Sequence, residues 1–127
     1  MTGEEVVRRA RALIGVRFRP QGRSRDTGVD CIGLVAVALE REDVRQDYRL
    51  RGGCQAELER GLEASGMRQA DGLAAGCVVV MRPGPEQLHL GIWSGSGLIH
   101  ADAGLGRVVE RPGAPPWPVL GRWRMEV

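Results

Sequence analysis

Residues 88–103 read LHLGIWSGSGLIHADA, and they decide the fold predicted for this chain. Two apolar runs flank the Gly- and Ser-rich SGSG, which is the pattern of a β-hairpin. Short runs rich in β-branched residues surround the hairpin: CVVVM at 77–81, RVVE at 107–110 and VLGRWRM at 119–125. The second half of the chain is therefore predicted to be an antiparallel sheet.

The first half carries helical signals instead. A capping-box pattern that begins at Thr2, followed by apolar residues with helical period, predicts a helix over 3–14. A largely buried helix is predicted to begin at or beside Cys31, and a short third helix is predicted within 54–66. Residues 15–29 lack a sustained period and are predicted to be a loop. Helices followed by strands indicate an α+β fold.

Length, composition and charge describe a single domain, residues 1–127, with no linker or internal repeat. The hydrophobic content of 43% and charged content of 27% are typical of globular proteins. The net charge is +2 and no basic run is interleaved with aromatic residues, so no nucleic-acid binding is expected. No window approaches the roughly 20 apolar residues of a membrane span, and the charged N-terminus is unlike a signal peptide. Synthesis in the cytoplasm is therefore expected.

The two histidines of the chain, His89 and His100, lie on either side of the SGSG connection. With a two-residue connection, or a four-residue one over 94–97, odd-numbered residues of the first strand pair with even-numbered residues of the second. Directly opposed residues share a face, and side chains alternate along each strand. The two histidines are therefore predicted to lie on the same face of the sheet, whereas a three-residue connection would separate them.

Cys31, at the predicted helix start, adds a thiol to these two imidazoles. The thiolate is the form that attacks a carbonyl, and a helix N-terminus and an imidazolium both lower the pKa of a thiol. One histidine would protonate the leaving amine, and the other would orient the first. The three side chains are the parts of a thiol hydrolase.

Other interpretations of the same residues stand beside this one. A cysteine in a buried helix is most often a small hydrophobic residue, and His89, between two leucines, is by itself more often structural than catalytic. Cys31 with the two histidines would supply three zinc ligands, but no short ligand spacing supports a metal site. The three cysteines, at 31, 54 and 77, form no CxxC motif, so neither a disulfide framework nor a zinc ribbon is predicted.

Three motifs resemble those of one family. DCIGLV at 30–35 resembles the DCSGLV-like helix start that carries the nucleophile of the NlpC family of papain-like cysteine peptidases, which cleave peptide bonds in bacterial cell-wall stem peptides. HLGIW at 89–93 resembles that family's HVGIY-type strand, and IHA at 99–101 resembles the context of its third polar residue. The resemblance covers most of the chain. It implies a papain-like fold with N-terminal helices packed on a C-terminal antiparallel β-sheet.

The resemblance also implies a role for each residue. Cys31 is implied as the nucleophile that forms an acyl-enzyme, His89 as the base and later the acid, and His100 as the group that orients His89. The backbone amide of Cys31 would be one donor to the oxyanion. Asp30 matches the family's aspartate, which would bind a substrate amine or cap the helix. The implied substrate is a peptidoglycan stem peptide, and no cofactor is implied.

Two positions near the expected cleft depart from the family pattern. Phe18, in RFR, stands where many relatives carry a tyrosine, and Ile32 stands where many carry a serine. Both changes remove a hydroxyl. These two positions and Asp30 are predicted to bind substrate, with an altered recognition of a free peptide amine.

Context suggests partners and alternatives. Arg19, Arg23 and Arg25 either attract carboxylates of an acidic stem peptide or belong to a solvated loop. The small size and the VDCIGLV context are similar to the family branch encoded with phage tails and gene transfer agents. That likeness implies phage-tail-like structural proteins as partners and delivery to the cell wall in such a particle. The alternative functions are a tail-tip assembly component with weak or absent hydrolysis, and an acyl transferase.

Overall fold

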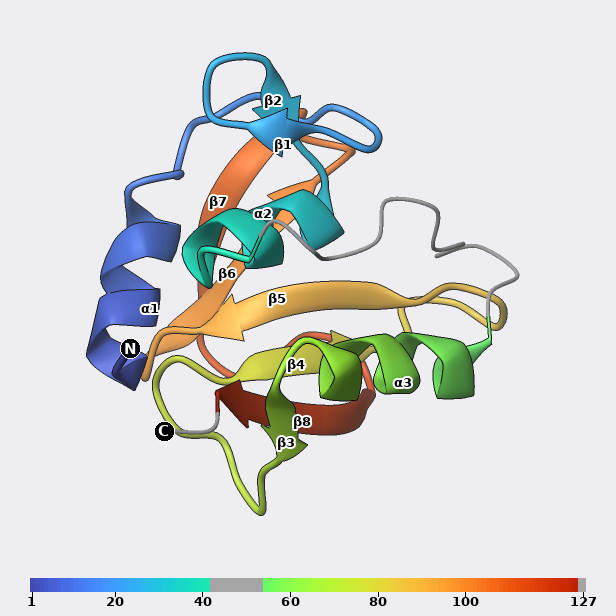
Figure 1. Ribbon diagram of the computed structural model, residues 1–127. Coiled ribbons are helices and arrows are strands. Elements are labelled where there is room, and N and C mark those ends of the chain that lie inside the picture. The colour runs from blue at the N-terminus through green and yellow to red at the C-terminus, as the bar shows by residue number, and fades with distance from the viewer. Residues whose placement is uncertain (42–53, 126–127) are drawn as a thin grey trace.

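A computed structural model describes residues 1–41 and 54–125 of the chain. Helices and strands follow the order α1 (Gly3–Arg11), β1 (Arg23–Ser24), β2 (Gly28–Val29), α2 (Cys31–Ala38), α3 (Gln55–Ala64), β3 (Met67–Gln69), β4 (Val78–Met81), β5 (His89–Trp93), β6 (Gly97–Asp102), β7 (Arg107–Pro112) and β8 (Val119–Met125). Strands β3 to β8 form an antiparallel sheet in the order β3-β8-β4-β5-β6-β7, while β1 and β2 pair separately. The predicted α+β fold, with helices packed on a C-terminal antiparallel sheet, is confirmed (Figure 1).

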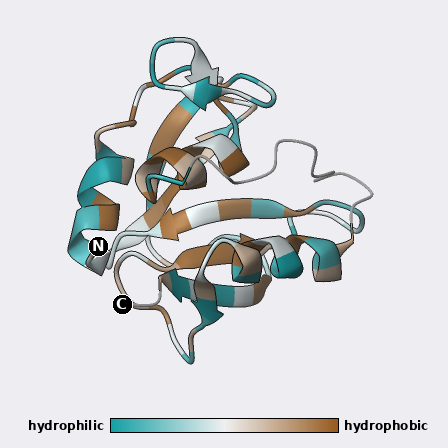
Figure 2. Cartoon of the chain, viewed as in Figure 1, coloured by the Kyte–Doolittle hydropathy of each residue, from teal (hydrophilic) through white to brown (hydrophobic). Residues whose placement is uncertain are grey.

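The helices cover one face of the sheet. In Figure 1, α2 lies over β5 with α1 beside it, α3 lies against β3, and β6 and β7 turn steeply away from β5. Leu34 of α2 and Leu90, Ile92 and Ile99 of the sheet are fully buried in the main core. Hydrophobic residues line α2 and the middle of the strands, whereas the outer side of α1 is hydrophilic (Figure 2). Burial of these side chains is the main force that joins the two halves.

The opposite face of the sheet carries a second, smaller cluster. Val79, Met81 and Leu98 are fully buried there, and Trp93 and Trp117 pack against them. Because strand residues alternate between faces, Leu90 and Ile92 of β5 enter the main core, and odd-numbered residues of β5 lie on the face of the second cluster, where Trp93 packs. This alternation determines where the histidines lie.

Several predicted boundaries need correction. The first helix ends at Arg11 rather than 14, because the next residues form turns that lead to Gly15 at φ +90. The segment 15–29, predicted to be a loop, contains β1 and β2 and also bridges the start of β7 through Arg17. Two-residue strands are too short to show a period of 2, so the prediction failed there. The short strand β3 was also missed, because it depends on pairing with the distant β8.

None of the described helices is long and apolar enough to cross a membrane.

Candidate active site

Cys31 is the first residue of α2, and Asp30 caps the helix. One carboxylate oxygen of Asp30, Oδ1, accepts a hydrogen bond from the Gly33 backbone amide, and Oδ2 accepts one from the Gln21 amide, both at 2.8 Å. A Cβ on Gly33 would collide with the carbonyl oxygen of Gly22, so the preceding loop packs directly on the first turn of α2. The predicted capping role of Asp30 is confirmed. These contacts fix the position of Cys31.

The thiol of Cys31 is buried, with 2% of the residue exposed. Burial raises the pKa of Cys31 to about 12, while hydrogen bonds from the backbone amides of Leu90, Ile32 and Cys31 itself act to lower it and Asp30 acts to raise it. A pKa lowered by the helix N-terminus and an imidazolium was expected, and this expectation was wrong. Desolvation of the charged form outweighs the helix-terminus amides. The thiol is therefore neutral at pH 7.

The hairpin has the predicted register. Ile92 pairs with Ile99 and Trp93 pairs with Leu98, so the connection has four residues, 94–97. The Ser94 hydroxyl donates to the Gly97 carbonyl oxygen at 3.0 Å and accepts from the Gly97 amide at 2.9 Å, which closes the turn. His89 and His100 consequently share a face, as predicted.

The two imidazoles are in direct contact. Nε2 of His89 lies 3.0 Å from Nδ1 of His100, and the ring centroids are 5.1 Å apart in an edge-to-face arrangement. Burial lowers the pKa of His89 to about 4, helped by His100, while Asp102 acts in the opposite direction. Burial also lowers the pKa of His100. Asp102 acts to raise this pKa, and Arg111 acts to lower it further. Both rings are therefore neutral at pH 7.

Near Cys31, β5 and β6 are paired over only part of their lengths. The ladder joins only Ile92 and Trp93 of β5 to β6, although both strands extend further. The Leu90 amide, on the side of β5 that faces β6, donates to the Cys31 sulfur instead. The sulfur thus lies against the residue that follows His89. No hydrogen bond joins Cys31 to either imidazole in the part of the chain that the structure describes.

Alternation along β5 explains this separation. Leu90 and Ile92 enter the main core, which also contains Cys31. His89 is four residues before Trp93 and lies on the same face of β5, toward the second cluster. The structure therefore brings the two imidazoles together and places the sulfur beside the backbone next to them. Direct contact between Cys31 and His89 would require the sulfur to pass from the main-core face of β5 to the face that carries the histidines.

Trp117 was missed by the sequence analysis. Its ring lies edge-to-face on both imidazoles, with centroids 5.4 Å from His89 and 5.5 Å from His100. It comes from the Pro-rich segment 113–118 between β7 and β8. The available signal was a single tryptophan between prolines, which restrict the backbone. Trp117 covers the histidines from the second cluster.

The remaining predicted site residues lie around α2. Phe18 is half-buried, packs against the main core and forms a parallel bridge with Val29, two residues before Cys31. Ile32 is 2% exposed and lines an apolar cavity of about 20 Å³ together with residues of α3 such as Leu58. Phe18 is thus near the helix start, whereas Ile32 faces the core. Substrate contact by either residue stays a prediction.

Within the described residues, no group of three or more His, Cys, Asp and Glu side chains is arranged to hold a metal ion.

Comparisons with known proteins place the fold. No family profile matches the sequence, and no curated protein matches it. Among solved structures, the chain is similar to NlpC1 from Trichomonas vaginalis (TM-score 0.71, 20% identity, 97% of this chain and 43% of that one). It is also similar to the peptidoglycan hydrolase RipB from Mycobacterium tuberculosis (TM-score 0.62, 20% identity, covering 98% of this chain and 65% of RipB). A third similar structure is the NlpC/P60 domain of the peptidoglycan hydrolase SagA (TM-score 0.59, 23% identity, covering 88% of this chain and 90% of that one).

These similarities define the class of fold: the chain has the papain-like α+β fold of NlpC/P60 domains. It spans 43% of the Trichomonas protein and 65% of RipB, so it matches only part of each.

Proposed function

We propose that the chain is a cysteine peptidase that hydrolyses amide bonds of peptidoglycan stem peptides through an acyl-enzyme on Cys31. The observation that carries the proposal is the combination of a capped helix start at Cys31 with the contacting pair His89 and His100. Two neighbours of the same fold, RipB and SagA, are peptidoglycan hydrolases, which supports this substrate class.

The His–His contact assigns the protons in this mechanism. If Nδ1 of His89 is to accept the thiol proton, His89 carries its proton on Nε2 and donates it to Nδ1 of His100. His100 then carries its own proton on Nε2. This hydrogen bond orients the His89 ring and supports the imidazolium that forms during the reaction.

The resting thiol and imidazole are neutral, so no preformed ion pair starts the reaction. As the sulfur attacks the carbonyl carbon, the thiol proton passes to His89. The developing oxyanion accepts a hydrogen bond from the Cys31 backbone amide. His89 then protonates the leaving amine as the carbon–nitrogen bond breaks, which leaves a thioester. Water, deprotonated by His89, hydrolyses the thioester and restores the thiol. Substrate must open the path between β5 and β6 for the first step.

A second candidate function is a tail-tip assembly component with weak or absent hydrolysis. The observation that favours it is the buried Cys31. Its raised pKa, and the lack of a hydrogen bond to either imidazole among the described residues, are those of a core cysteine. The delivery route belongs to the same question. We propose cytoplasmic synthesis and transport to the cell wall with phage-tail-like proteins, supported by the small size and the VDCIGLV context.

Incubation with defined muropeptides, followed by mass spectrometry of the fragments, tests both candidates. The wild type is expected to release a peptide fragment, Cys31→Ala to release none, and His100→Ala to be slower but active. A transient adduct on Cys31, trapped by acid quenching, would identify the thioester. Release of the same fragment by Cys31→Ala would refute the peptidase mechanism, and no release by the wild type would favour the assembly role. A fragment joined to an added amine would instead identify acyl transfer.

A further inference from the structure

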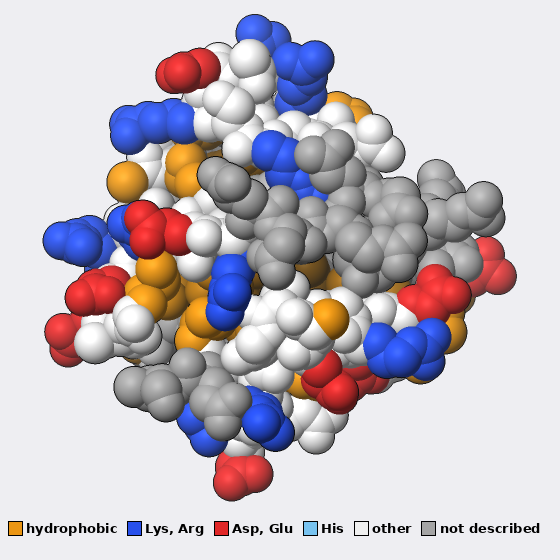
Figure 3. Space-filling model, viewed as in Figure 1, with side chains coloured by type: hydrophobic (Ala, Val, Ile, Leu, Met, Phe, Trp, Pro, Cys, Tyr) orange, Lys and Arg blue, Asp and Glu red, His pale blue; other side chains and the backbone are white. Residues whose placement is uncertain are grey.

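Three exposed arginines meet at the end of the molecule that carries β1 and β2. Arg17 and Arg19 belong to the segment that leads from α1 to β1, and Arg107 is the first residue of β7. Arg17 and Arg107 are partners in an isolated antiparallel bridge. Arginine side chains, drawn in blue, lie over this end of the molecule in Figure 3. We call Arg17, Arg19 and Arg107 the arginine surface.

Gly28 allows two of these side chains to lie side by side. A Cβ on Gly28 would lie 2.7 Å from Cβ of Arg19 and 2.9 Å from Cγ of Arg17, and its φ of +122 also favours glycine. The two aliphatic stems therefore pack on the bare backbone of Gly28. Since like charges that directly oppose each other destabilise a sheet, the fold itself gains nothing from this arrangement of charge.

The nearby carboxylates do not neutralise the arginine surface. Asp102 is the register partner of Arg107, but its Oδ1 accepts from the Leu105 amide, and Asp26 lies in the exposed turn between β1 and β2. Within residues 1–41 and 54–125, the ion pairs are those of Arg9 with Glu40 and of Arg11 with Glu110. The three guanidinium groups are thus available to an external anion.

The arginine surface adjoins the candidate active site through Val29. The Val29 amide donates to the Arg17 carbonyl oxygen at 3.1 Å, and the Arg19 amide donates to the Val29 carbonyl oxygen at 3.0 Å. Asp30 and Cys31 follow directly in the chain. An anionic polymer held by these arginines would therefore pass beside the start of α2.

We propose that the arginine surface binds carboxylates of the peptidoglycan and holds the polymer beside Cys31. The inference rests on the proposed function, because it assumes this substrate. A guanidinium binds a carboxylate with two parallel hydrogen bonds, and several such groups on one surface raise the local concentration of an anionic partner. We name carboxylates as the bound anion because stem peptides carry them.

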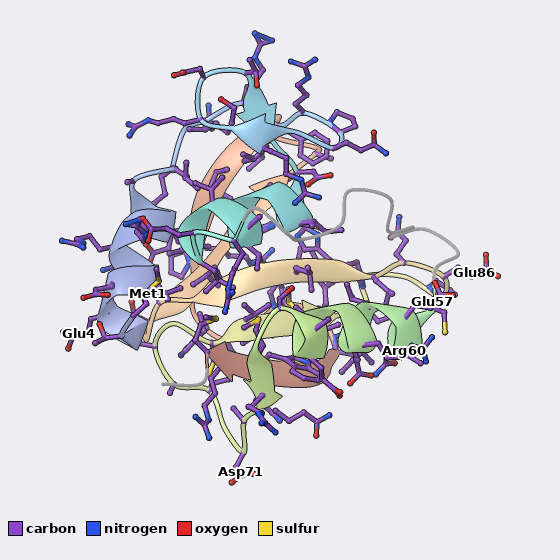
Figure 4. All side chains as sticks on the ribbon, in the orientation of Figure 1. Met1, Glu4, Glu57, Arg60, Asp71 and Glu86 are labelled. Atoms are coloured by element: carbon purple, nitrogen blue, oxygen red, sulfur yellow. The ribbon has the colours of Figure 1, made fainter. Side chains whose placement is uncertain are left out.

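Sedimentation with purified sacculi tests the inference without requiring hydrolysis. The full chain is compared with the triple variant Arg17→Gln, Arg19→Gln, Arg107→Gln at about 20 mM and about 500 mM salt, where screening differs strongly. The matched control carries Arg8→Gln, Arg60→Gln and Arg124→Gln, three exposed arginines on other parts of the surface. Arg60 projects from α3, away from β1 and β2 (Figure 4). Thermal unfolding checks that all variants fold.

The triple variant is expected to bind sacculi at least about tenfold more weakly than wild type at low salt, with the difference lost at high salt. The control variant is expected to bind as wild type does. Sacculi whose carboxylates have been amidated should bind wild type and triple variant equally. Phosphate polymers are unaffected by amidation, so a persistent difference on amidated sacculi would overturn the choice of carboxylate.

Equal binding by the triple variant and wild type, equal weakening in the control, or no binding by wild type would each overturn the inference. Arginine-dependent binding without any muropeptide hydrolysis would instead refute the peptidase proposal alone. A lysine variant at the same three positions separates charge from geometry. It should retain the salt dependence but bind more weakly than arginine, because lysine is a point charge.

Discussion

Trp117 is predicted to hold the two histidines in their neutral state. It covers both imidazoles at centroid distances of 5.4 and 5.5 Å, and burial is the largest cause of the lowered pKa of His89. The change from the ordinary value of 6.5 to about 4 corresponds to about 3 kcal/mol against the protonated form. In Trp117→Leu, water reaches the rings, and the pKa of His89 should rise from about 4 toward 6.5.

The same substitution changes how stability depends on pH. Because the folded-state pKa of His89 lies below its unfolded value, its contribution is fully present above about pH 6.5 and is lost as pH falls through about 4. Wild type should therefore lose up to about 3 kcal/mol of unfolding free energy across this window. The loss should be smaller in Trp117→Leu, even if the variant is less stable at pH 7.

Titration of the imidazole protons by NMR and urea unfolding at several pH values are the measurements. Trp93→Leu is the matched control, since Trp93 packs in the same second cluster without a ring contact to either histidine among the described residues. A His89 pKa that stays near 4 in Trp117→Leu would refute the reasoning. So would an equal rise in the Trp93 variant, because burial by Trp117 would then not be the cause.

Three further outcomes are expected. Asp30→Ala should lower the free energy of unfolding by about 1 to 2 kcal/mol through loss of the N-cap, with Asp30→Asn losing less, and urea denaturation measures both. Gly33→Ala should lower the free energy of unfolding by about 1 to 3 kcal/mol because the new Cβ has no room against the loop. Gly72→Ala, with open space around it, should change stability little. Similar urea denaturation midpoints for the two variants would contradict the packing argument. Iodoacetamide should modify the exposed Cys54 well before Cys31, because burial raises the pKa of Cys31 to about 12, and peptide mapping that finds Cys31 alkylated first would contradict the buried thiol.

Local patterns were sufficient for the elements whose signals lie within a few residues. The capping box at Thr2, the helix start at Cys31 and the hairpin around 94–97 all formed as predicted. In each case, a side chain close in sequence satisfies a backbone group or the turn sets the register. The shared face of His89 and His100 followed from the same alternation.

Contacts between distant segments were beyond that reasoning. The short strand β3 exists because β8 pairs with it, and the segment containing Arg17 is ordered against β7. Trp117 reaches the histidines from a loop whose prolines restrict the backbone but do not reveal the destination of the ring. Such pairings depend on where the whole sheet places its edges and faces.

The sequence alone determined an α+β fold, a capped helix with a cysteine at its start, and two histidines on one sheet face, because capping, periodicity and strand alternation act over short distances. Only the tertiary structure decided that Cys31 lies in the main core against Leu90, that Trp117 covers the imidazoles, and that the Cys31 thiol and the His89 imidazole are both neutral at pH 7. The physical reason is that desolvation depends on every side chain packed around a group, and these side chains come from all parts of the chain.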